Sequence, residues 1–156
     1  MRVGVELRND GDEDVWVVGV VDGSEAGVRY PRWRPAVLHD GRAVATPPAP
    51  EEPMTGPLRA TDFRRLAPGE AFDPTARAGG AAYLPLLTFA TFAPQQPGAY
   101  TLTLELSTES ERPDEWLGSW GQDRERDRVL ELVEQVPPMT VRSNDLVVDV
   151  SEHREH

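Results

Sequence analysis

The sequence predicts an all-β protein, an antiparallel β-sandwich, from one strongly patterned strand and the turn that begins it. Residues 97–106 open with a Pro-Gly turn and then alternate between apolar and polar residues. The apolar side chains fall on one face, at Tyr100, Leu102, Leu104 and Leu106. This period of two indicates a sheet with one dry and one wet side. The length of 156 residues fits one domain, placed at 1–150 and followed by a flexible charged tail at 151–156.

Two strands are expected near the N-terminus. Residues 3–7 alternate, with valine and leucine on one face and charged residues opposite, and 9–12 contain an Asp-Gly turn. Residues 15–21 are apolar on both faces, which predicts a central strand covered on both sides. The two strands are expected to form a hairpin, although strands joined by a tight turn also cross between the sheets of a sandwich.

The next region is predicted from its prolines and turn residues. Pro31 and Pro35 interrupt the pattern over 28–38, which is therefore expected to be irregular. A tight turn at 39–42 is expected to join two short strands, at 36–38 and 43–45.

The second half is predicted to hold short strands and one helix. An exposed proline-rich loop at 46–57 precedes three strands, at 62–66, 71–72 and 86–92. Residues 108–122 are polar and acidic. Residues 123–136 follow a helical period with one apolar stripe, at Val129, Leu132, Val133 and Val136. A last strand is expected at 146–150.

Four short turn-strand motifs stand in order along the chain. They are Leu7-Arg8-Asn9-Asp10-Gly11, Leu66-Ala67-Pro68-Gly69-Glu70, Pro97-Gly98-Ala99-Tyr100-Thr101-Leu102 and Ser143-Asn144-Asp145-Leu146-Val147-Val148. Together they resemble bacterial immunoglobulin-like β-sandwich domains. The resemblance implies an immunoglobulin-like antiparallel sandwich with one inserted α-helix near 123–136, in a domain that binds, spaces or decorates and rarely catalyses.

Tyr100 has a structural interpretation of its own. A tyrosine near the start of a core strand can return its hydroxyl to a nearby backbone group and so lock a corner of a sandwich. We therefore expect Tyr100 to serve packing more than function.

The composition excludes several classes of function. The chain has no cysteine, which excludes disulfides, thiolate metal sites and cysteine nucleophiles. It also has no lysine and no isoleucine, whose codons are AT-rich, and this indicates a GC-rich bacterial genome. The net charge of −11 repels phosphate backbones, so we expect no nucleic-acid binding.

The best candidate ligand surface lies in the acidic segment at 108–122. Trp116 and Trp120 offer flat apolar rings, and carboxylates surround them, at Glu111, Asp114 and Glu115. Tryptophan suits sugar stacking or an interface anchor, but packing of the inserted helix onto the sandwich is the favoured interpretation of these rings. Paired carboxylates also serve acid/base catalysis, for which the sequence offers no set distance.

A second aromatic pair, Tyr30 and Trp33, stands in the only local run of positive charge, formed by Arg29, Arg32 and Arg34. Stacking of arginine on the aromatic rings explains this run. A site for an acidic ligand is the alternative.

No motif predicts a metal, a cofactor or a catalytic centre. Asp10, Asp12 and Asp14 alternate like the start of a calcium loop, but the loop glycine and the twelfth-position glutamate are missing. The three histidines, His39, His153 and His156, give no complete zinc ligand set. We therefore expect neither metal nor cofactor.

These observations predict a non-catalytic binding or protein-interaction module. The partner is expected to be another protein, and the oligomeric state is left open. One alternative is an acidic inhibitor or immunity-type protein that blocks a basic surface, and another is a small carbohydrate-binding module. No segment reads as a signal peptide or a membrane span, so a cytoplasmic location is expected if Met1 is the native start.

Overall fold

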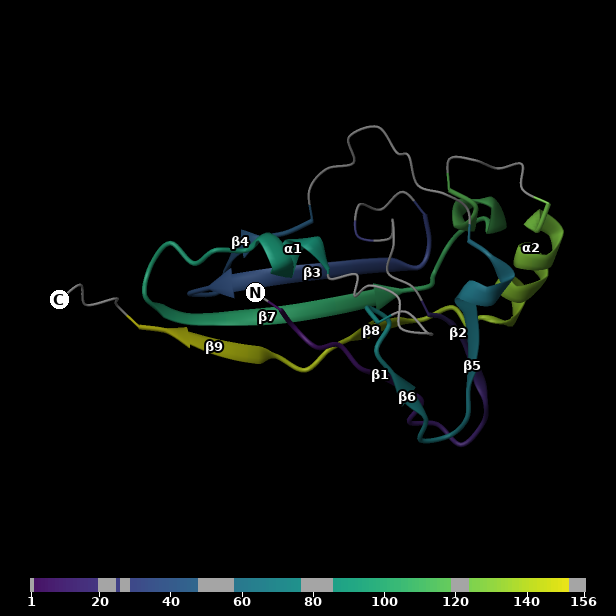
Figure 1. Cartoon of the computed structure of the whole chain (residues 1–156), viewed down its shortest axis with the longest axis horizontal. Coiled ribbons are helices and arrows are strands. Elements are labelled where there is room, and N and C mark those ends of the chain that lie inside the picture. The colour runs from purple at the N-terminus through teal and green to yellow at the C-terminus, as the bar shows by residue number, and fades with distance from the viewer. Residues whose placement is uncertain are drawn as a thin grey trace.

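The computed structural model describes residues 2–19, 25, 29–47, 58–76, 86–118 and 124–151. Strands hold more of these residues than helices do, and every pairing among the described strands is antiparallel (Figure 1). In chain order the elements are β1 (Leu7–Arg8), β2 (Val15–Val18), β3 (Arg32–His39), β4 (Arg42–Ala45), η1 (Ala60–Asp62), β5 (Phe63–Leu66), β6 (Ala71–Phe72), α1 (Leu87–Thr91), β7 (Gly98–Ser107), η2 (Pro113–Trp116), α2 (Arg126–Gln135), β8 (Thr140–Arg142) and β9 (Leu146–Val150). The predicted all-β class is confirmed.

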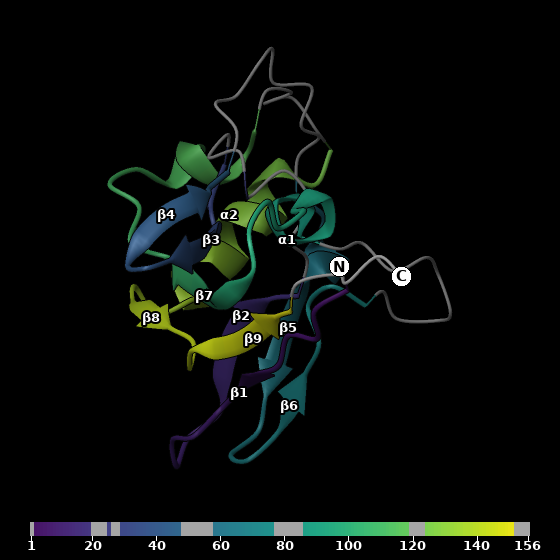
Figure 2. The ribbon, with the colours of Figure 1, turned by 90° about the vertical axis from the view of Figure 1, so that its left-hand side faces the viewer.

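A five-stranded sheet is the largest layer (Figure 2). Its order is β4-β3-β7-β8, and β9 pairs with the same side of β7 as β8 does. β7 is the strand with the strongest sequence pattern, and its predicted apolar face is buried, at Tyr100, Leu102, Leu104 and Leu106. The opposite face carries Thr101 and Glu105, which are half-buried. The alternation of β7 therefore predicted its dry face correctly.

The prediction that 28–38 is irregular was wrong, because β3 passes through Pro35 without a break. Pro35 lies opposite Leu104, whose backbone groups point to the other side of β7. The Leu104 N–H donates to Ser143 Oγ (2.9 Å), and its carbonyl accepts from the Ser143 N–H (2.8 Å). Pro35 therefore occupies a non-hydrogen-bonded position of the β3–β7 ladder, where a missing donor costs nothing.

The predicted tight turn at 39–42 is confirmed. His39 pairs with Arg42, and the two residues between them, Asp40 and Gly41, have φ angles of 51° and 74°. Two consecutive positive φ angles define the type I′ turn, whose twist matches that of a hairpin. This turn joins β3 to β4, which forms one border of the five-stranded sheet.

The first two predicted strands do not form a hairpin. β1 pairs with β6, and β2 pairs with β5, so the Asp-Gly turn connects two separate two-stranded sheets. β2 is also not central, since β5 is its sole strand partner among the described residues. The crossing arrangement was the alternative that the sequence left open.

Asn9 joins two of the sequence motifs in space. Its side-chain amide donates to the carbonyls of Glu13 (2.7 Å) and Leu66 (3.0 Å). Its backbone N–H donates to Glu70 O (2.9 Å), and its carbonyl accepts from the Gly69 N–H (2.8 Å). One buried residue thus holds the turn after β1 against the turn after β5.

The strand predicted at 86–92 is instead the short helix α1. A residue that is distant in the sequence binds its first N–H groups. The Glu25 carboxylate accepts from Leu87 N–H (2.8 Å) and Thr88 N–H (2.7 Å). The Thr88 hydroxyl also donates to this carboxylate. A residue distant in the sequence therefore binds the first turn of this helix, a contact that the local apolar pattern does not reveal.

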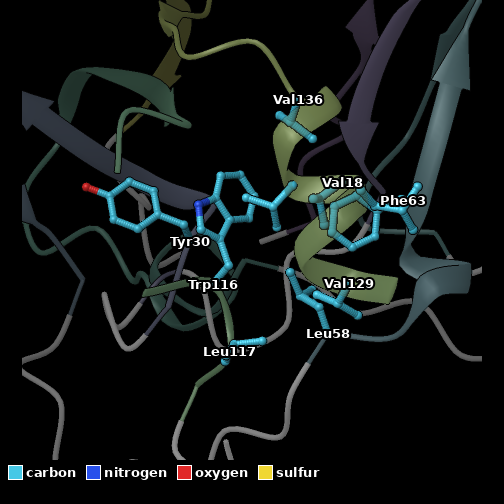
Figure 3. Close-up of a cluster of buried hydrophobic side chains, with 10 residues drawn as sticks. Val18, Tyr30, Leu58, Phe63, Trp116, Leu117, Val129 and Val136 are labelled. Carbon is cyan, nitrogen blue, oxygen red and sulfur yellow. The ribbon is translucent and has the colours of Figure 1, made fainter. Parts of the chain in front are cut away.

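The helix predicted at 123–136 is confirmed as α2, and its apolar stripe is buried. α2 packs on β2, β5 and η2 in one core cluster, and Trp116 lies in this cluster between Tyr30 and α2 (Figure 3). A second cluster fills the dry face of the large sheet, where Trp33 and Val37 of β3 pack with the apolar face of β7. The described residues thus form two hydrophobic cores.

Some expectations fall outside the described residues. They include most of the proline-rich loop at 46–57, most of the tail at 151–156, and the end of the predicted strand at 15–21. Within the described part of the chain, no helix is long and apolar enough to cross a membrane.

Candidate functional site

A groove of about 710 Å³ opens between β4, α1 and the segment that leads into β7. Val44 and Leu87 stand on its two walls, and about half of each residue is exposed (49% and 58%). The floor is aromatic, made by His39, Phe92 and Tyr100. Three segments that are far apart in the sequence therefore form one concave apolar surface.

Tyr100 organises the floor of the groove. Its hydroxyl donates to the Gln96 carbonyl (2.7 Å) and accepts from the Gln96 N–H (3.3 Å). This is the backbone contact that the sequence predicted for Tyr100. The ring stacks on His39, with centroids 4.4 Å apart, and meets Phe92 at a tilt with centroids 5.3 Å apart. Aromatic pairs in such arrangements contribute about 0.5–1.5 kcal/mol beyond the area that they bury.

His39 is held in one orientation. Its Nδ1 lies 3.1 Å from the Ala99 carbonyl, and since a carbonyl only accepts, Nδ1 carries the proton of this bond. Nε2 lies 3.7 Å from the Asp40 carboxylate at the tip of the β3–β4 turn. The imidazole side chain lines the groove but is only 16% exposed, so most of it is covered by neighbouring residues.

Gly98 makes this arrangement possible. Its φ is +131°, and a Cβ placed there would lie 2.8 Å from His39 Cε1. Any larger residue would therefore strain the backbone and displace the imidazole. The Pro-Gly turn that predicted the start of β7 thus also leaves room for the floor of the groove.

The α1 wall depends on Glu25. Because the Glu25 carboxylate binds the first N–H groups of α1, it fixes Leu87 and Thr88 at the rim of the groove. Thr91 adds a hydroxyl that donates to the Leu87 carbonyl (2.7 Å), within the same short helix.

The described residues that line the groove carry almost no charge. They include no aspartate, glutamate or arginine, although 28% of the chain is charged. The polar groups that it offers are amides and hydroxyls, from Gln95, Gln96, Thr46 and the threonines of α1. A charged ligand would lose hydration here without gaining an ion pair, whereas apolar groups would bury area on both walls. In the described ranges, no group of three His, Cys, Asp or Glu residues could hold a metal ion.

The predicted tryptophan surface is not open at Trp116. This ring is 1% exposed, and its Nε1 donates to Ser110 Oγ (2.7 Å). It tilts against Tyr30 with centroids 5.8 Å apart (Figure 3), so it packs the inserted helix, as one sequence interpretation expected. Trp120, the other half of the predicted pair, lies outside the described residues.

The carboxylates of that segment serve its local structure. Glu115 accepts from the backbone N–H groups of Glu111 (3.0 Å) and Arg112 (3.2 Å), which caps η2. Asp114 is exposed and lies 3.6 Å from the Arg112 guanidinium. Glu111 is also exposed, but it contributes only its backbone to this cap.

The second predicted aromatic pair is split between the two cores. Tyr30 belongs to the α2 cluster and Trp33 to the cluster on the large sheet. The Arg32 guanidinium lies over the Tyr30 ring, 4.4 Å from its centroid, which is the stacking that the sequence suggested. Both rings are buried, so each of them packs in its own core.

Sequence reasoning missed most of the groove. Val44 and Leu87 were assigned to strands, and Phe92 lay at the end of the wrongly predicted strand at 86–92. The Pro94-Gln95-Gln96-Pro97 segment was a usable signal for the groove, because its two side-chain amides lie just before the start of β7. Comparison with protein-family models, curated proteins and solved structures gave no match.

Proposed function

We propose that this chain is a non-catalytic protein-interaction module of the immunoglobulin-like β-sandwich kind. Its contact site in this proposal is the groove between β4 and α1, and the ligand is an uncharged apolar segment of another protein. The observation that supports it is the exposure of Val44 and Leu87 on facing walls above an aromatic floor. Large apolar side chains that remain exposed beside a groove typically mark a binding site.

Two features make the groove a better site than the acidic segment. Its floor is preorganised, because Tyr100 and His39 are both fixed to backbone carbonyls. Its volume of about 710 Å³ lies within the range of about 300–1,000 Å³ that is typical of ligand pockets. A rigid site loses little conformational entropy on binding, which favours affinity.

The direct test selects ligands from a random peptide library displayed on phage. We expect uncharged apolar peptides to be enriched on the wild-type protein. Leu87→Glu places a charge on the rim and should weaken these peptides at least about tenfold. Val141→Glu is the matched control, since it places the same charge at another exposed apolar residue (41%), on β8 and outside the lining of the groove. Peptides that bind Leu87→Glu as well as wild type would overturn the proposal.

The same experiment separates the alternatives. An acidic inhibitor that uses the net charge of −11 would select basic peptides, and their binding would collapse at high salt. A carbohydrate-binding module would select no peptide and would instead bind a glycan array. Binding of apolar peptides that is insensitive to salt supports the groove as the site.

A further inference from the structure

Exposed apolar side chains gather at the two borders of the large sheet. The groove border has Val44 and Leu87, and the opposite border has the other large exposed hydrophobics of the described residues, Val141 (41%), Leu146 (44%) and Val147 (57%). Figure 2 shows β4 at one border and β8 and β9 at the other. The β8–β9 border is separate from the proposed binding groove and needs its own explanation.

The outer edge of β9 directs backbone groups away from β7. Leu104 of β7 bonds toward the β8–β9 side, so the other even-numbered residues of β7 point the same way. Their partners on β9 are its even-numbered residues. The odd-numbered residues Val147 and Asp149 therefore direct their N–H and C=O groups outward, where no strand among the described residues meets them.

The β9 edge of the large sheet lacks the protection that the β4 edge has. β4 spans four residues, carries Arg42 and sits beside an irregular register with β3. β9 spans five residues, pairs with β7 in continuous register, and contains one charged residue, Asp149. Protected edges are typically short, bulged or charged, and a regular apolar edge instead accepts another strand.

We propose that β9 pairs antiparallel with β9 of a second copy of this chain, about a two-fold axis at Val148. Val147 of each copy then lies opposite Asp149 of the other and exchanges both backbone hydrogen bonds with it. Val148 faces its own counterpart, and Leu146 faces Val150 of the second copy. The two large sheets become one continuous sheet.

The charge on β9 selects this register. Moving the axis to Val147 sets Asp145 opposite Asp149 of the second copy, and moving it to Asp149 sets two identical aspartates opposite each other. Like charges directly opposite across strands are destabilising. An axis at Val148 avoids both clashes, because each Asp149 faces a valine.

The apolar pattern favours a second copy of the chain as the occupant. Leu146, Val148 and Val150 share the sheet face that carries the core, and Val148 and Val150 already pack against that core. Because their spacing is symmetric about Val148, the pairing continues this apolar strip across the interface. Dimers with two-fold symmetry are the commonest protein assemblies.

The first experiment is sedimentation velocity of the full chain from about 10 μM to about 1 mM, the range in which a small interface associates. We expect a monomer–dimer equilibrium whose dissociation constant falls as salt rises. Each copy carries a net charge of −11, and salt screens the repulsion between the two copies. Amide exchange at Val147 and Asp149 should slow at high protein concentration, while the β7 amides stay unchanged. A chain that is monomeric throughout, or a dimer that leaves these two amides unprotected, overturns the proposal.

Three variants test the register. Val147→Pro removes an outward donor from each copy and should weaken the dimer about tenfold or more, while the β7 ladder is kept. Val147→Thr keeps the donor and the branched side chain, so it should leave the dimer within about twofold. Val147→Arg faces Asp149 of the second copy and should tighten the dimer at low salt.

A Val147→Pro variant that unfolds at the wild-type midpoint yet dimerises like wild type contradicts the pairing. If the proline variant unfolds, the Val147→Arg variant still tests the register. A Val147→Arg dimer that is weaker than the wild-type dimer at low salt is incompatible with this register. Peptide binding in the groove is expected to be the same in monomer and dimer, so the two proposals fail separately.

Discussion

Tyr100 donates its hydroxyl to the Gln96 carbonyl across the turn that begins β7, and the same ring forms the floor of the groove. Packing and the candidate binding function therefore depend on one side chain. Tyr100 follows this turn in the sequence and also closes it, through the hydrogen bond to Gln96. The fold itself therefore holds the floor of the groove in place.

Replacing Tyr100 with phenylalanine removes this hydrogen bond and keeps the ring. Tyr100→Phe should lower the free energy of unfolding by about 1 kcal/mol, because Gln96 loses a partner. Chemical denaturation measures the change. Apolar peptides should still bind in the groove, since the ring that they contact is retained. A variant as stable as wild type would show that the hydroxyl contributes nothing to the corner.

Glu25 is expected to control the helical state of α1. Glu25→Ala removes the acceptor of the Leu87 and Thr88 N–H groups, and should cost about 1–2 kcal/mol of unfolding free energy. Amide exchange at these two residues should become faster than in Glu25→Gln, which keeps one acceptor oxygen. Unchanged exchange in the alanine variant would mean that α1 is stable without the carboxylate.

Trp116 is expected to be essential for the α2 core. Trp116→Ala should destabilise the protein by about 3–5 kcal/mol, the range for removing a buried tryptophan. Ser110→Ala deletes only the partner of the indole N–H and should cost about 1 kcal/mol. Thermal unfolding compares the two variants. A Trp116→Ala protein of wild-type stability would contradict the buried position of this ring.

Glu70 gives the fold a predicted dependence on acid. The Ala67 N–H and the Arg64 guanidinium hold the pKa of the Glu70 carboxyl below its ordinary value. A carboxylate with a lowered pKa adds stability above its unfolded-state pKa and loses it as the pH falls through the folded pKa. Wild type should therefore exceed Glu70→Gln in stability at neutral pH.

The advantage should shrink below about pH 4, where a glutamate in the unfolded chain is protonated. Urea denaturation of both proteins between neutral pH and pH 3 measures this convergence. Glu111→Gln is the control, since the Glu111 side chain is exposed and caps nothing. A stability difference that is constant with pH would rule out the ionised carboxylate as its cause.

The sequence predicted elements whose cause is local. The alternation of β7, the apolar stripe of α2 and the Asp40-Gly41 turn each follow from neighbouring residues, and all are confirmed. The errors occurred where a distant residue decides the conformation. β3 accommodates Pro35 at a non-hydrogen-bonded position opposite Leu104, and the distant Glu25 binds the first turn of α1.

The candidate site escaped prediction for the same reason. Val44, Leu87 and Tyr100 lie far apart in the sequence, and no spacing rule connects them. The chemistry of the tryptophans predicted a ligand surface, yet Trp116 is buried. Residue type alone does not separate a side chain that packs a helix from one that faces a ligand, since both functions favour large apolar groups.

The position of β7 in the large sheet has a consequence for synthesis on the ribosome. β3 and β4 emerge before β7, so β7 can pair on that side as soon as it leaves the exit tunnel. Its other side waits for β8 and β9, which are translated only after η2 and α2. During this interval the longest strand of the nascent chain has an open edge, and chaperones that recognise extended apolar segments are expected to engage it there.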